Sequence, residues 1–64
     1  MRIVRKTYAI ITNTGKEVQL TFDINMETKE SFLAELRISK PLNKKEVKAV
    51  WKIIDKIKES LRSS

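Results

Sequence analysis

Residues 41–61 read PLNKKEVKAVWKIIDKIKESL, and they are the most informative part of the 64-residue chain. Asn43 is a favourable helix N-cap, and Glu46 stands three residues later, where its carboxylate can return to the Asn43 amide as a capping box. Apolar residues then recur every three or four positions, as on one face of an α-helix. They are Val47, Val50, Ile54, Ile57 and Leu61. The segment predicts a helix from Lys44 to about Arg62 whose apolar stripe must be covered.

The covering surface is predicted upstream, where residues 3–12 and 16–25 have the pattern of two β-strands. The second alternates strictly, with Val18, Leu20, Phe22 and Ile24 on one face. The connection Thr12-Asn13-Thr14-Gly15-Lys16 suits a type I turn closed by a left-handed glycine bulge. It resembles the first hairpin turn of ubiquitin-like folds, and the resemblance implies a hairpin here, not a ubiquitin-like function. The turn sets Ile10 opposite Val18, Tyr8 opposite Leu20 and Lys6 opposite Phe22.

Residues 31–39 fit two interpretations. As a strand, the segment would place Phe32, Ala34, Leu36 and Ile38 on the inner face and Leu33, Glu35 and Arg37 on the outer face. As a helix, Phe32, Leu33 and Leu36 would form a short apolar patch. We favour the strand, because two strands alone make a poor platform for a long helix.

The predicted fold is therefore α+β: a three-stranded antiparallel sheet packed on one C-terminal helix, in the order β-β-β-α. Residues 1–64 are expected to form one small domain, since a chain of this length buries a single core at most. The inner sheet face is expected to consist of Val4, Tyr8, Ile10, Val18, Leu20, Phe22 and Ile24.

Composition argues against most catalytic and metal chemistry. The chain has no Cys and no His, so disulfides are excluded and we expect no metal site. The segment from Asp23 to Glu27 imitates the start of a calcium loop but lacks the glycine and the closing glutamate. No phosphate-binding loop, dinucleotide fingerprint or nucleophile motif occurs. We expect a protein that is not an enzyme and has no cofactor.

Charged residues follow Met1 directly, and no apolar run is long enough for a signal peptide or a membrane span. A cytoplasmic protein without membrane contact is the expectation.

The net charge of +6 is concentrated in the C-terminal part. Residues 1–39 hold six Lys/Arg against five Asp/Glu, whereas residues 40–64 hold eight against three. A row of lysines on the helix face opposite the apolar stripe could track nucleic-acid phosphates. The candidate nucleic-acid-binding residues are Lys40, Lys44, Lys45, Lys48, Lys52 and Lys56. The alternative is a solvated face whose lysines pair with Asp55 and Glu59.

The β-β-β-α outline is shared by sheet-reading DNA-binding arms of transposases and integrases, in which the exposed sheet is the reader. Here the outer face is nearly neutral, with Arg5 and Arg37 against Asp23 and Glu35. Charge therefore places any DNA or RNA contact on the helix.

Apolar residues left outside the core would support a homodimer. The candidate interface residues are Ile3, Ile11, Leu33, Trp51 and Ile53. Trp51 is expected to be a core residue at the edge of the helix stripe, or alternatively a binding anchor. Two functions remain open from the sequence: a small basic nucleic-acid-binding protein, and a homodimeric or heteromeric interaction module.

Overall fold

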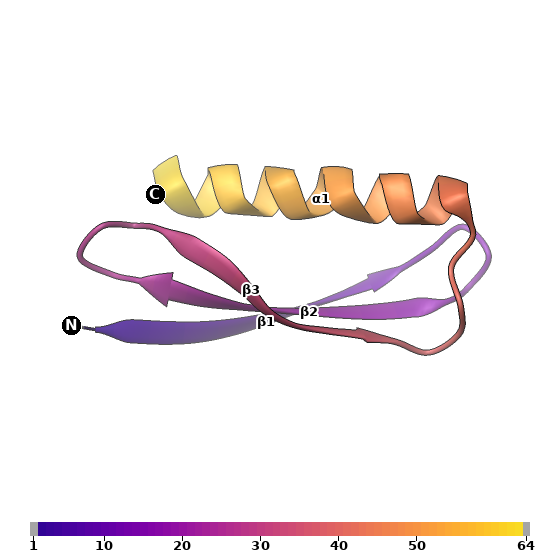
Figure 1. Ribbon diagram of the computed structural model, residues 1–64, viewed down its shortest axis with the longest axis horizontal. Helices are drawn as coiled ribbons and strands as arrows, with labels where there is room; N and C mark the ends of the chain where they lie inside the picture. Colours follow the sequence, from indigo (N-terminus) through magenta and orange to yellow (C-terminus); the bar gives the residue numbers. More distant parts are fainter. Residues whose placement is uncertain (1, 64) are drawn as a thin grey trace.

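The computed structural model describes residues 2–63, which form three strands and one helix. The strands are β1 (Ile3–Ile11), β2 (Glu17–Asn25) and β3 (Ser31–Ile38), and the helix is α1 (Lys44–Ser63). They form one antiparallel sheet of order β1-β2-β3 with α1 lying along it (Figure 1). The predicted β-β-β-α fold is confirmed, and 31–38 is a strand rather than a helix.

The first hairpin has the predicted register, with Ile10 opposite Val18 and Lys6 opposite Phe22. Gly15 adopts a φ of 81°, the left-handed conformation that closes the turn. Its N–H donates to the carbonyl of Thr12 at 2.9 Å. The turn predicted from residues 12–16 therefore sets the register of β1 and β2, and with it the sheet face on which each of their side chains lies.

The first half of β3 corrects the prediction. A β-bulge next to Thr21 and Phe22 leaves Ala34 without a partner on β2, so residues before it change face. Leu33 lies opposite Phe22 and packs against the core, whereas Phe32 lies opposite Asp23 and is 60% exposed. The expected inward Phe32 and outward Leu33 are thus both wrong. After the bulge, Leu36 and Ile38 take the predicted inner-face register opposite Leu20 and Val18, although each stays 42% exposed.

The helix begins as the capping box predicted. Asn43 Oδ1 accepts the Glu46 N–H at 2.8 Å, and Glu46 Oε1 accepts the Asn43 N–H at 3.0 Å. The core then forms between one helix stripe and the alternating face of β2. Its buried apolar residues are Val18, Leu20, Phe22, Ile24, Val50, Ile54 and Leu61.

Two residues of α1 depart from the expected core. Val47, counted in the apolar stripe, is 40% exposed, and Trp51 is 52% exposed. Both stand on the flank of α1 toward β3. The prediction that Trp51 is a core residue is therefore wrong.

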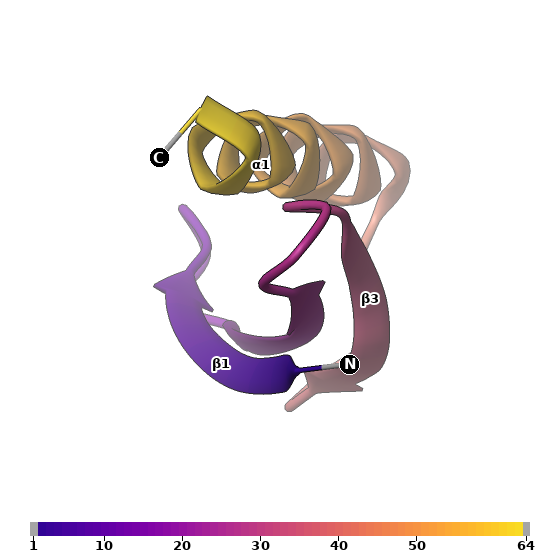
Figure 2. The same ribbon diagram turned by 90° about the vertical axis from the view of Figure 1, so that its left-hand side faces the viewer.

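The sheet curls around one side of the helix (Figure 2). The molecule measures 38 × 18 × 14 Å along its principal axes, and the helix runs along the longest one. Because nothing within residues 2–63 covers the far side of α1, that side faces solvent along its whole length.

Candidate nucleic-acid interface

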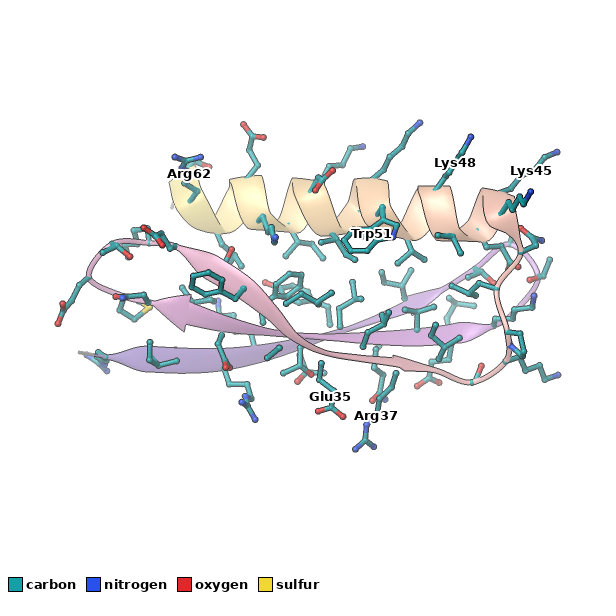
Figure 3. The ribbon with its side chains drawn as sticks, in the orientation of Figure 1. Glu35, Arg37, Lys45, Lys48, Trp51 and Arg62 are labelled. Atoms are coloured by element: carbon teal, nitrogen blue, oxygen red, sulfur yellow. The ribbon has the colours of Figure 1, made fainter. Side chains whose placement is uncertain are left out.

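The six lysines predicted to contact nucleic acid are all exposed. Lys45, Lys48 and Lys52 are exposed residues of α1, and Figure 3 shows the first two directed away from the sheet. Lys56 continues the row one turn later, while Lys40 and Lys44 lie on the approach to the helix and in its first turn. We call the row Lys45, Lys48, Lys52 and Lys56 the lysine face.

In the part of the chain that the structure describes, the lysine face has no acidic partner. Within residues 2–63, none of its four ammonium groups makes a salt bridge or a side-chain hydrogen bond. The alternative interpretation paired Asp55 and Glu59 with neighbouring lysines, and among the described residues these two acids make no salt bridge either. The ion pairs that the solvated-face interpretation allowed do not form here, and an exposed row of lysines is compatible with both interpretations.

The one remaining acid of the helix, Glu46, is turned inward and fully engaged. Its carboxylate accepts hydrogen bonds from Lys16 Nζ at 2.8 Å and from Thr14 Oγ1 at 2.7 Å, besides the Asn43 amide. Lys16 Nζ also donates to the Pro41 carbonyl at 2.9 Å. These contacts join the β1–β2 turn to the start of α1.

These donors stabilise the ionised form of Glu46. Led by the Asn43 backbone amide and followed by Lys16 and Thr14, they lower its pKa from the ordinary 4.5 to about 2, although burial alone would raise it. The carboxylate is 9% exposed, so it is an internal ion-pair partner rather than a surface charge.

The cations of the outer sheet face are also paired. Arg5 Nε donates to Asp23 Oδ1 at 2.8 Å, and this hydrogen bond lowers the pKa of the Asp23 carboxyl. Arg37 Nε donates to Glu35 Oε1 at 2.5 Å. Figure 3 shows Glu35 and Arg37 on the side of the sheet opposite the helix.

The ion pair between Lys16 and Glu46 neutralises one charge of each sign, so both residues can be left out when the net charge of each part of the chain is counted. Without Lys16, residues 1–39 hold five cations against five acids and cancel. Without Glu46, residues 40–64 hold eight cations against two acids. The whole formal charge of +6 thus belongs to α1 and the segment leading into it.

Toward its C-terminal end, α1 is more mixed in charge. A shallow open hollow lies between the helix and the start of β3, and three cations and three acids share its lining. Among them, Lys58 and Arg62 belong to α1 but were not among the predicted contacts. Asp55 and Glu59 accompany them there, so the positive surface is least mixed from Lys40 to Lys52, and Lys56 lies at the border of the mixed part.

The residues predicted for a dimer interface are scattered. Ile3 and Ile11 are 51% and 64% exposed, at opposite ends of β1. Leu33 packs against the core and is removed from any outer-face patch. Trp51 is exposed and Ile53 is half-buried, on opposite flanks of α1.

Sequence analysis missed the partners of Glu46. Thr14 and Lys16 lie 32 and 30 residues from it, and no local pattern connects them. The predicted topology did carry one signal. In an antiparallel sheet of three strands, the turn between the first two strands lies at the same end as the C-terminal end of the third strand, and the helix starts from that end.

Within residues 2–63, no cluster of three or more Asp, Glu, His or Cys side chains is placed to hold a metal ion. The described helix is not apolar enough over a sufficient length to cross a membrane. No protein-family model, curated protein or solved structure gives a significant match to this chain.

Proposed function

We propose that the protein binds nucleic acid through the lysine face of α1, mainly by contacts to phosphate groups. The observation that carries the proposal is the segregation of charge: among the described residues, Arg5 and Arg37 on the outer sheet face and Lys16 beside the helix start have acidic partners, whereas the lysine face has none. Releasing counter-ions from phosphates supplies the free energy of this kind of binding. Lysines that have no internal partner can bind phosphates without first breaking ion pairs within the protein.

The dimensions of the lysine face suit an extended polyanion. Lys45 and Lys56 are eleven residues apart, which is about 16 Å along a helix. Duplex DNA carries roughly one phosphate charge per 1.7 Å of axis, so this length of α1 passes several phosphates. The major groove is wide enough to admit a helix.

The side chains of this face position a protein rather than read bases. A lysine ammonium is a flexible point charge that contacts phosphate oxygens of any sequence. The face carries no Arg, Asn or Gln, the side chains that make paired hydrogen bonds to guanine or adenine. We therefore infer binding with little sequence preference.

A charge-matched pair of variants tests the proposal. The helix variant carries Lys45→Gln, Lys48→Gln and Lys52→Gln. The control carries Arg2→Gln, Arg5→Gln and Lys6→Gln. It removes the same number of positive charges, three, from the other end of the molecule. Titration of a fluorescent 20-base-pair DNA and of the matching RNA at low salt should show the helix variant weakened by about ten-fold or more, and the control much less.

Two results would contradict the proposal. Equal weakening by both variants would mean that net charge, not the helix, decides the interaction. No measurable binding of the unmodified protein to either nucleic acid at low salt would mean that the charge serves solubility.

A further inference from the structure

The free edge of β3 presents backbone groups that no part of the described chain covers. Strand β3 ends the sheet, because the order is β1-β2-β3. The Ser39 N–H points inward and donates to the Glu17 carbonyl at 3.0 Å. Alternate residues of an antiparallel strand direct their N–H and C=O groups to opposite sides. Leu36 and Ile38 therefore direct theirs outward from the sheet.

The other edge of the sheet carries an inward-facing charge, whereas the edge of β3 past its bulge carries none. On β1, Lys6 lies opposite Phe22 and places a charge on the inner face. Charges turned inward at an edge strand discourage pairing with another strand. On β3, the inner-face residues past the bulge are Leu36 and Ile38, which carry no charge and leave the edge open.

Apolar surface continues from this edge onto the helix. Figures 1 and 2 show β3 starting close to α1 and diverging from it toward its C-terminal end. Two apolar side chains of each element stay exposed, and we call these four the apolar strip: Leu36 and Ile38 at 42% each, Val47 at 40% and Trp51 at 52%. A chain of 64 residues is marginally stable alone, so covering such a strip is worth more here than in a large domain.

The side chains of β3 are complementary to those of β3 in a second copy of this chain. Two copies related by a two-fold axis pair edge strands antiparallel, and an axis at Leu36 places that residue opposite its own copy. Glu35 then lies opposite the partner's Arg37, and Arg37 opposite the partner's Glu35. Ala34, which has no partner on β2, lies opposite the partner's Ile38, a small side chain beside a large one.

We propose that this chain forms a two-fold homodimer by antiparallel pairing of β3 with β3 of a second copy, centred on Leu36, with the apolar strips brought together beneath the two helices. Both charges at the outer face then have an opposite charge across the new strand pair. Arg37 can serve Glu35 of its own chain and the partner's Glu35, because its guanidinium has five N–H donors. The lysine faces stay exposed on the far side of each helix, so the dimer does not depend on the proposed function.

Charge reversal at β3 tests this register. Glu35→Arg alone, or Arg37→Glu alone, places like charges opposite each other twice in the dimer. Like charges directly opposite each other destabilise a strand pair, so two repulsive pairs should raise the dimer dissociation constant about ten-fold. The double variant Glu35→Arg with Arg37→Glu restores opposite charges and should recover the dimer. Both side chains are exposed, at 47% and 74%, so the monomer should keep its fold in all three.

Sedimentation equilibrium of the full chain over micromolar to millimolar concentrations measures the association. Arg5→Glu with Asp23→Arg, the same exchange at the β1–β2 pair, is the matched control and should leave it unchanged. Trp51, the single tryptophan, provides a second readout: its emission should shift to shorter wavelength as concentration rises. A monomer at millimolar concentration overturns the proposal, and so does a dimer that the single reversals do not weaken.

Discussion

Glu46 is an acidic residue whose charge is used inside the protein. It closes the capping box of α1, and it receives Lys16 and Thr14 from the turn of the first hairpin. A buried carboxylate with three donors is stabilising while it stays ionised and costly once a donor is removed. This one residue therefore couples helix initiation to the position of the hairpin.

The lowered pKa of Glu46 predicts acid sensitivity. A folded-state pKa of about 2 against 4.5 favours the folded protein at all pH values above 4.5, and this stabilisation is lost as the pH falls from 4.5 toward 2. Chemical denaturation between pH 7 and pH 2 should show a falling free energy of unfolding over that window. Glu46→Gln should remove most of the slope.

Asp23 supplies the control, because its pKa is lowered too, by the Arg5 hydrogen bond at an exposed site. Asp23→Asn should remove less of the acid dependence than Glu46→Gln. An unchanged slope in Glu46→Gln would show that its hydrogen bonds do not form in solution.

At the residue scale, sequence reasoning succeeded where partners are close in the chain. Asn43 and Glu46 are three residues apart, and the helix geometry alone brings them together. Gly15 was found because a left-handed turn position strongly favours glycine. Lys16 and Glu46 meet only through the packing of α1 on the sheet, so their contact has no local signature.

The elements form where the hydrophobic period is clear. Strand β2 alternates without interruption and α1 repeats at three and four residues, and both were predicted to within a residue or two. Strand β3 has two adjacent apolar residues, Phe32 and Leu33, so alternation cannot tell which points inward. The bulge at Ala34 decides it, and it depends on how β3 fits β2.

The N-cap residue of α1, Asn43, is predicted to contribute measurably to the stability of the fold. Asn43→Ala removes the acceptor of the Glu46 N–H and should lower the free energy of unfolding by about 1 kcal/mol. In a domain of this size that corresponds to a fall of about 4–8 °C in Tm. Thermal unfolding followed by circular dichroism measures it.

Asn43→Ser is the matched control, since a serine hydroxyl also caps a helix. It should stay close to the unmodified protein. Equal losses in both variants would indicate that the side-chain cap is not the source of the effect.

For the whole molecule, charge and fold are linked. The fold turns Glu46 inward to Lys16 and pairs Arg5 and Arg37 across or along the sheet. What remains is a nearly neutral sheet and a helix carrying the entire net charge. Counting charged residues in the sequence predicted most of the positive excess of residues 40–64. That the helix and its approach carry all of it became clear only from the structure, in which Glu46 is buried and paired with Lys16.

The β-β-β-α architecture followed from the sequence because its core is simple: one alternating strand under one helical stripe. The exposure of Val47 and Trp51 did not follow, because it depends on how far β3 diverges from α1. That divergence is a property of sheet twist over three strands, which no single segment encodes.

The salt dependence of DNA binding reports how many phosphates the lysine face contacts. If the lysine face neutralises four to five duplex phosphates, the logarithm of the association constant should fall against the logarithm of salt concentration with a slope of about −4. Lys45→Gln, Lys48→Gln and Lys52→Gln together should reduce that slope to about −1, one unit for each lost contact. The same slope in this variant as in the unmodified protein would show that the phosphate contacts lie elsewhere and that the lysine face does not bind nucleic acid.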